Sequence, residues 1–205
     1  MTISVLPVDE LPEIRAGDVV SELLVGAVTD LRTGDVVVVA AKIVSKAEGR
    51  LVADADDLVE REAVRVLRRR GDAVIAETAQ GFVCTDAGVS RANVEPGWAA
   101  LLPLDADRSA RRLRDGIRAR AGVHVGVIVA DGFDRPWRDG RTGVALGCAG
   151  VAAVVDGVCV ADELASAAHL VRRGVAIVRG VDASWLREAA VADEVVGDPA
   201  RHLFR

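Results

Sequence analysis

The residues with the most evident chemical potential follow a buried strand in segment 127–143, which reads VIVADGFDRPWRDGRTG. The apolar run ends at Asp131, a carboxylate next to a glycine and therefore well placed to bind a metal ion. Arg135 and Arg138 come next, and a guanidinium suits the forked recognition of carboxylate or phosphate. Interleaved charges in a surface loop also satisfy one another as ion pairs. Both interpretations of this segment remain open from the residues alone.

Other polar residues stand at predicted strand ends and turns. Lys42 and Lys46 flank an apolar stretch, and a lysine such as Lys46 before a glycine turn is able to hold a phosphate as a point charge. Asn93, in the turn-rich loop 86–97, is a candidate contact for a base, ribose or phosphate, although Asn and Gly favour such loops in any case. His169, on a predicted helix, is interpreted as a packed or half-exposed side chain. For each of these residues taken alone, the structural role is the favoured one.

Short motifs of several common enzyme classes are absent from the chain. Neither G-x-x-x-x-G-K-[ST] nor G-x-G-x-x-G occurs, and G-x-S-x-G and H-E-x-x-H are missing as well. The three cysteines, Cys84, Cys148 and Cys159, lack C-x-x-C spacing, and the three histidines lie far apart, so no zinc-site pattern is present. We expect free thiols in a reducing compartment.

Composition favours one globular domain over residues 1–205. The chain is 51% hydrophobic and only 3% aromatic, so its core must consist of small aliphatic side chains, and a mean hydropathy of +0.27 argues against disorder. The net charge of −5 lacks the basic excess of a nucleic-acid-binding protein. Neither a signal peptide nor an apolar run of membrane-spanning length is recognisable. We therefore expect a cytoplasmic protein without nucleic-acid or membrane partners.

The elements that must position these residues alternate between strands and helices. Periodicity predicts strands at 2–7, 36–46, 73–77, 81–84, 98–102, 123–130 and 174–179. It predicts helices at 18–31, 56–70, 105–120, 161–171 and 184–192. The nearly continuous apolar run that begins at Val36 indicates a strand covered on both faces. The glycine-rich run 143–157 indicates bulges or close backbone approach. This alternation predicts an α/β or α+β fold in one compact unit.

Eight phrases in order resemble the coenzyme F-420-0:L-glutamate ligase family, also called gamma-glutamyl ligases. They cover nearly the whole chain, and no single phrase is decisive. The phrases are LPEI (11–14), GDVVVVAAKIVSKAEGRLV (34–52), EAVRVL (62–67), AGVSRANV (87–94), LLPLD (101–105), VIVADGFDRPWRDGRTGVALGCAG (127–150), VADELASAAHLV (160–171) and VAIVRG (175–180).

The resemblance implies a reaction and an architecture. That family adds L-glutamate in γ-linkage to the lactyl tail of a deazaflavin coenzyme. GTP would phosphorylate the coenzyme's carboxylate, the amine of glutamate would attack the acyl phosphate, and phosphate would leave. Mg²⁺ or Mn²⁺ would offset the shifting charge. The family fold is α+β, with mixed β-sheets and flanking helices, and forms an intertwined homodimer with the site in a groove near the dimer interface.

The resemblance also assigns roles to particular residues. Lys46 and Asn93 match nucleotide-contacting residues of the family, and Asp131 matches a metal-binding aspartate. Arg135 and Arg138 match the arginines of the family's D-T-x-G-R-x-x-R-x-G-Q-T-D phrase and would contact phosphate or substrate. The family's guanine-nucleotide stretch matches Leu11, Pro12, Glu13 and Ile14.

Several departures fall on ligand-binding positions. Ser90 stands where the family has a second metal-binding aspartate, and Gly132 stands where it usually has threonine. The family's Q-T-D is Arg141-Thr142-Gly143 here, and two segments are shorter, between GCAGV and VADEL and between HLV and VAIVRG. Asp134 replaces a glycine, and Ala41 replaces a serine or threonine. The departures leave three hypotheses: a glutamate ligase, an amide ligase for another carboxylate, and a non-catalytic binding or scaffold protein.

Overall fold

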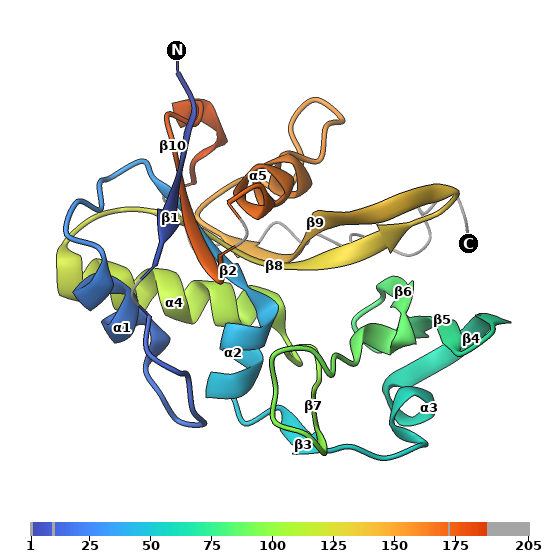
Figure 1. Cartoon of the computed structure of the whole chain (residues 1–205). Helices are drawn as coiled ribbons and strands as arrows, with labels where there is room; N and C mark the ends of the chain where they lie inside the picture. Colours follow the sequence, from blue (N-terminus) through green and yellow to red (C-terminus); the bar gives the residue numbers. More distant parts are fainter. Residues whose placement is uncertain (1, 10, 172, 188–205) are drawn as a thin grey trace.

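A five-stranded mixed sheet forms the centre of the computed structural model, which describes residues 2–9, 11–171 and 173–187 (Figure 1). β2 and β8 pair in parallel, and the other neighbouring strands pair antiparallel. This mixed sheet with flanking helices confirms the expected α+β class. In spatial order its strands are β1 (Ser4–Val8), β10 (Val175–Arg179), β2 (Val36–Ala40), β8 (Gly126–Arg135) and β9 (Arg138–Ala149).

Helices cover both faces of this sheet (Figure 1). Val37 and Val39 pack into the core on one face, whereas Val36 and Val38 pack into the core on the other, which confirms that both faces of this strand are covered. None of the helices within the described ranges is long and apolar enough to cross a membrane. The first face carries α1 (Val20–Ala27), α2 (Ala41–Ala47) and α4 (Ala106–Ala121), and the second carries α5 (Val160–His169).

A smaller region beside the main sheet contains the remaining elements (Figure 1). Leu58, Val74, Ala76 and Leu101 form part of its separate core. Its two sheets have the orders β3-β7 and β4-β5-β6. The elements are β3 (Leu51–Ala53), α3 (Leu58–Glu62), β4 (Ala63–Arg70), β5 (Ala73–Thr78), β6 (Val83–Thr85), the 3-10 turn Asp86–Gly88 and β7 (Trp98–Ala100).

The predicted strand 36–46 and the predicted helix 56–70 are both wrong over part of their length. The expected strand 36–46 ends at Ala40, and α2 follows, with Ala41 and Val44 buried on one side three residues apart. That spacing lies on one helical face, and the valines before it concealed the change of period. The expected helix 56–70 is instead the short α3 and then β4. The pairing of β4 with β5 overrides the local helical pattern there.

The charged segment after Asp131 is the arm of a β-hairpin rather than the predicted loop. β8 continues to Arg135, and β9 returns from Arg138 beside it, with Gly132 opposite Gly143. Residues 134–141 of this arm are exposed. The arm leaves the core and meets water on both faces, so its sequence lacks the alternation of apolar and polar residues that identifies a half-buried strand.

The glycine-rich run that follows contains both features expected of it. The register between β8 and β9 shifts after Val129, where Leu146 is the extra residue of a bulge. The bulge lets β9 keep apolar residues on both faces, because Leu146 joins one core and Ala145 the other. Close approach occurs at Gly147, where an added Cβ would lie 2.3 Å from the backbone carbonyl carbon of Ala106.

The other predicted elements are confirmed apart from shifts at their ends. The exception is the last predicted helix, 184–192, of which only the 3-10 turn Ala183–Trp185 is present; residues 188–192 lie outside the described part of the chain. Cys84, Cys148 and Cys159 are reduced thiols, as expected.

A buried ion pair, not foreseen from the sequence, connects the start of β2 to the end of β10. Asp35 is 1% exposed, and its two carboxylate oxygens each accept a 2.8 Å hydrogen bond from Arg179, through Nε and one terminal nitrogen. The backbone N–H of Arg32 donates to the same carboxylate at 2.9 Å. The hydrogen bonds from Arg179 to the Asp35 carboxylate are the main cause that raises the pKa of Arg179 above its usual range. The pair therefore closes the turn that starts the central strand.

Candidate functional site

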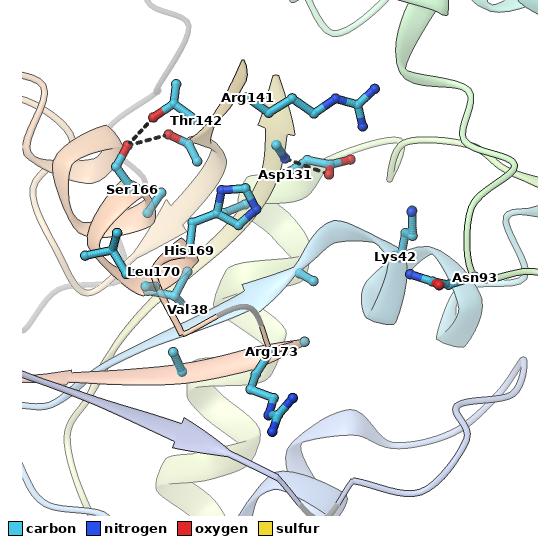
Figure 2. Close-up of a pocket in the computed structure, with 18 residues that line it drawn as sticks. Val38, Lys42, Asn93, Asp131, Arg141, Thr142, Ser166, His169, Leu170 and Arg173 are labelled. Carbon is cyan, nitrogen blue, oxygen red and sulfur yellow. Dashed lines mark hydrogen bonds between the residues drawn. The ribbon is translucent and has the colours of Figure 1, made fainter. Parts of the chain in front are cut away.

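A cavity of about 750 Å³ opens where the parallel strands β2 and β8 end (Figure 2). Ala40 and Ala130 are paired in register at the ends of their apolar runs. Because parallel strands point the same way, the residues that follow them emerge at one edge of the sheet. Lys42 on α2 and Asp131 on β8 are brought to one cavity in this way. Its charged or titratable lining residues are Lys42, Asp131, Arg141, His169 and Arg173.

Asp131 presents an oriented carboxylate to this cavity. Its Oδ1 accepts a 2.7 Å hydrogen bond from the backbone N–H of Gly132. Burial raises the pKa of Asp131, while the Gly132 hydrogen bond and the charges of Lys42, Arg141 and His169 act in the opposite direction. Desolvation therefore outweighs the surrounding positive charge in the ligand-free chain. A bound cation would reverse that balance by stabilising the charged carboxylate.

Lys42 joins the cavity to the 86–97 loop. Its Nζ donates a 3.1 Å hydrogen bond to the backbone carbonyl of Ala92. Burial lowers the pKa of this amine, and the charge of Asp131 raises it again in part. Asn93, the next residue of the loop, also lines the cavity and has a left-handed backbone, with φ of 57°. A lysine and an asparagine are thus held on the wall opposite α5 (Figure 2).

Positive side chains predominate in the cavity, although two of them have partners outside it. Arg141 Nε lies 3.5 Å from Asp134 Oδ2 on the hairpin arm. Arg173 Nε donates to Asp9 Oδ1 at 2.5 Å. Lys42 faces Asp131 across the cavity. Three cationic side chains against one lining carboxylate produce a positive field that suits an anionic ligand.

Helix α5 reaches the cavity because two glycines form a bare patch beneath it. Gly132 and Gly143 are cross-strand partners. A Cβ on Gly143 would lie 2.4 Å from the carbonyl oxygen of Ala165, and a Cβ on Gly132 would lie 3.1 Å from His169 Cε1. Ser166 fastens the helix there, since its hydroxyl donates to the Gly143 carbonyl at 2.8 Å. Its Oγ also lies 2.9 Å from Thr142 Oγ1 (Figure 2).

Only part of the predicted site gathers in the cavity. Asp131 and Asn93 line it. Lys46 does not; it forms an ion pair with Glu13, which connects two segments predicted to contact nucleotide. Ile14 is buried in the main core, so its side chain has a packing role.

Arg135 and Arg138 lie opposite each other beside the exposed turn of the hairpin, outside the lining of the main cavity. Arg135 instead borders a smaller cavity of about 320 Å³ that Phe82 and Phe133 also line. Ser90, at the place of the family's second metal aspartate, exchanges two 2.9 Å backbone hydrogen bonds with Ala100. It is not among the lining residues either.

Sequence reasoning missed the contribution of α5. His169 was interpreted as a packed or half-exposed histidine, yet its exposed ring lines the cavity. Ser166 and His169 are three residues apart, a spacing that places them on one helical face. Buried Ala165 and Ala168 stand next to them in sequence and mark the neighbouring side of the helix. The polar pair at this spacing was the available signal.

The donor set of the cavity limits how a metal ion would be held. Asp131 is the single carboxylate among the described residues that line it. Throughout the described ranges, no three His, Cys, Asp or Glu side chains gather in a metal-binding group. Mg²⁺ in phosphate-handling sites commonly uses one or two carboxylates, with substrate phosphates and water completing its shell. One carboxylate, that of Asp131, is enough to bind a Mg²⁺ or Mn²⁺ ion that also has phosphate ligands. It is not enough to bind such an ion through protein ligands alone.

The family model and the curated relatives that match this chain all carry the name of the same ligase family. The family model described as F420-0:Gamma-glutamyl ligase matches residues 9–69 and 54–180. A coenzyme F420:L-glutamate ligase of Methanopyrus kandleri is 34% identical over 248 positions, which span 100% of this chain and 98% of the relative. The ligase of the same name from Methanothermobacter thermautotrophicus is 35% identical, with 83% of this chain and 84% of the relative aligned.

The ligase of that name from Haloarcula marismortui is 34% identical over 98% of this chain and 95% of its own length. The Methanopyrus kandleri alignment has 248 positions, whereas this chain has 205 residues. That relative therefore carries residues that this chain lacks, in keeping with the two shortened segments.

Proposed function

Because the chain belongs to the F420-0:gamma-glutamyl ligase family, we propose that it joins L-glutamate to a coenzyme F420 precursor through an amide bond. The observation that carries the proposal is the cavity at the ends of β2 and β8, where Lys42, Asn93 and Asp131 converge. Its volume of about 750 Å³ is in the range of small-molecule sites. Its positive lining suits the phosphates and carboxylates of such substrates.

The proposed reaction proceeds in two steps. A carboxylate oxygen of the precursor attacks the γ-phosphorus of GTP, which forms an acyl phosphate and releases GDP. The amine of glutamate then attacks the acyl carbon, and inorganic phosphate leaves as the amine loses a proton. Lys42 is positioned to stabilise negative charge on a transferring phosphoryl group, because its Nζ is held at the cavity wall by the Ala92 carbonyl.

The remaining residues have binding roles in this proposal. Asn93 contacts the nucleotide from the loop that Lys42 anchors. The ion pair between Glu13 and Lys46 sets the position of the Leu11, Pro12, Glu13 and Ile14 stretch, where the guanine nucleotide would bind. Arg135 and Arg138, which flank the turn between β8 and β9, would contact phosphate or substrate from the hairpin arm.

Asp131 would hold the Mg²⁺ or Mn²⁺ ion. A divalent ion bound there would neutralise charge on phosphate oxygens. The carboxylate is already oriented for this purpose by the Gly132 amide. Since Asp131 is the single lining carboxylate among described residues, the ion should bind much more tightly with nucleotide than alone.

We further propose that the protein is a homodimer. β4 is an edge strand of its three-stranded sheet, and all its residues after Ala63 are exposed. Val64 is 69% exposed, and Trp137 at the hairpin turn is 100% exposed. Unpaired edges and exposed large apolar side chains are features that a second subunit covers. Sedimentation that shows only monomer at micromolar concentration would exclude this assembly. The reduced thiols also favour a reducing cytoplasm as its location.

Titration calorimetry tests the nucleotide site directly. GTP is titrated into the protein with Mn²⁺, and Mn²⁺ is titrated alone. We expect GTP to bind with Mn²⁺, Mn²⁺ alone to bind weakly, and Asp131→Ala to lose the metal-dependent binding. Asp72→Ala, which removes an exposed carboxylate elsewhere, is the matched control.

Mass spectrometry tests the reaction itself. Protein, GTP, Mg²⁺, L-glutamate and the coenzyme precursor are incubated together, and addition of one glutamyl group is expected. The proposal is refuted if the parent protein does not bind GTP and does not form the product.

Ser90 favours a second candidate, a non-catalytic or repurposed member of the family. Its backbone groups are occupied by Ala100, and its hydroxyl offers only a weak neutral ligand where the resemblance implies a carboxylate. A protein of this kind would bind a ligand or partner without consuming GTP. A third possibility, between these two, is an amide ligase that acts on another carboxylate. GTP turnover that depends on an acid other than the coenzyme precursor would identify such an enzyme.

A further inference from the structure

The imidazole ring of His169 packs at a position that is available only because no side chain lies beneath it. Its ring packs over Gly132, where an added Cβ would lie 3.1 Å from Cε1 and 3.5 Å from Nε2. Contacts of 3.0–3.4 Å are tighter than nine in ten of those made by real Cβ atoms, so the ring would have to shift by a few tenths of an ångström to admit a side chain at 132. The position of the His169 ring therefore depends on the glycine at 132.

Gly143 brings the whole end of α5 to this position. An added Cβ there would lie 2.4 Å from the Ala165 carbonyl oxygen and 2.9 Å from the Ser166 backbone nitrogen. Any side chain at 143 would lift the helix from β9 and withdraw His169 from the cavity. The cross-strand pair of Gly132 and Gly143 thus places an imidazole where the chemistry of the cavity converges.

The groups facing this imidazole come from three other elements. Asp131 projects from β8, Arg141 from β9 and Lys42 from α2 (Figure 2). On its own helix, Ser166 is engaged with Gly143 and Thr142. The ring therefore borders a positive space beside a single carboxylate, and it is exposed to that space. An imidazole N–H in this position has an anionic oxygen as its natural hydrogen-bond partner.

We propose that His169 is a ligand-binding residue that donates a hydrogen bond to an oxyanion of the substrate. The oxyanion is either a phosphoryl oxygen of the nucleotide or a carboxylate oxygen of the acceptor. This inference rests on the proposed function, because both ligands come from it. The paired glycines Gly132 and Gly143 are the feature of the fold that makes the contact available.

Binding measurements on side-chain variants test the inference and distinguish the two ligands. Dissociation constants are measured by calorimetry for GTP with Mg²⁺ and, separately, for the coenzyme precursor. His169→Ala should weaken one of the two by about tenfold or more, the usual effect of losing a hydrogen bond to a charged group. His169→Gln retains an N–H donor and should recover part of the loss.

Two further variants separate a binding role from a structural one. Gly132→Ala leaves the imidazole in the protein but displaces it, so it should weaken the same ligand as His169→Ala, to a smaller degree. His124→Gln is the matched control, because His124 borders a different cavity, of about 300 Å³. It should bind both ligands as the parent does. Melting temperatures establish that each variant is folded.

A loss confined to GTP identifies the phosphoryl contact, and a loss confined to the precursor identifies the carboxylate contact. If the parent binds these ligands and folded His169→Ala binds both equally well, the inference is wrong while the proposed function stands. If the parent binds neither ligand, the proposed function and the inference both fail.

Discussion

Replacing Gly143 by alanine is a sharp test of the contact between α5 and the main sheet. The new methyl carbon would lie 2.4 Å from the Ala165 carbonyl oxygen, 2.6 Å from the Ala165 carbonyl carbon and 2.9 Å from the Ser166 nitrogen. These are backbone atoms of a packed helix and cannot rotate aside. Gly143 does not have a positive φ, so the expected effect is steric rather than conformational.

The magnitude follows from the contacts that must change. Inserting a methyl group into a packed interface typically costs about 1–3 kcal/mol. The two hydrogen bonds of Ser166 Oγ, to the Gly143 carbonyl and with Thr142 Oγ1, would lengthen as the helix moves, and each contributes about 0.5–1.5 kcal/mol. We expect a total loss of about 3 kcal/mol in the free energy of unfolding. For a chain of this size, that is a fall of about 6–12 °C in Tm.

Urea unfolding followed by circular dichroism measures this loss, and calorimetry measures the Tm. Gly26→Ala is the control, because Gly26 lies within α1 and an added Cβ there meets nothing within 4 Å. It should stabilise the chain by about 0.4–1 kcal/mol through a more restricted unfolded state. If Gly143→Ala unfolds within about 0.5 kcal/mol of the parent, α5 does not pack on β9 as described and the proposed seat of His169 is wrong.

Three other measurements test particular interactions. Burial raises the pKa of Asp131, so ionising this carboxyl lowers the free energy of unfolding of the parent protein. The loss is absent below the ordinary pKa of 3.8 and complete above the raised folded-state pKa. In EDTA, Asp131→Asn should therefore be more stable than the parent at pH 7 in urea unfolding, and an advantage that persists unchanged to pH 3 would contradict this cause. Arg179→Met leaves the buried Asp35 carboxylate without its ion-pair partner and should cost about 3 kcal/mol. Arg32→Ala, at a solvent-exposed pair, should destabilise the chain much less, and equal losses for the two variants would show that burial does not matter here. Burial raises the pKa of Cys84 to about 12, so about one thiol in 10⁴ is ionised at pH 8, and mass-mapped alkylation should reach it only on unfolding. Rapid labelling of Cys84 in the native protein would refute that placement.

Long, strongly patterned segments were predictable from the sequence. The 105–120 prediction agrees with α4 at Ala106–Ala121 because its apolar positions recur at helical spacing between an Asp105 cap and Gly122. The covered strand that begins at Val36 was equally plain. In such segments, local preference and tertiary environment favour the same structure.

The errors occur where local preference and tertiary pairing disagree. Segment 63–70 has a helix-like pattern but becomes β4 because β5 offers it a hydrogen-bonded partner. The hairpin arm after Asp131 lacks an apolar face, so nothing in its pattern distinguishes paired strands from a loop. Strand pairing is a long-range property, and a window of neighbouring residues does not contain it.

The same division applies to the site. By resemblance, the sequence alone identified the family and selected Asp131 and Asn93, both of which line the cavity. Only the tertiary structure decided that Lys42 meets Asp131, because this depends on the parallel pairing of β2 with β8. It also decided that His169 belongs to the cavity, because two glycines on neighbouring strands must align beneath one helix. Residue types determine which chemistry is possible, whereas the packing of distant segments determines which groups share one space.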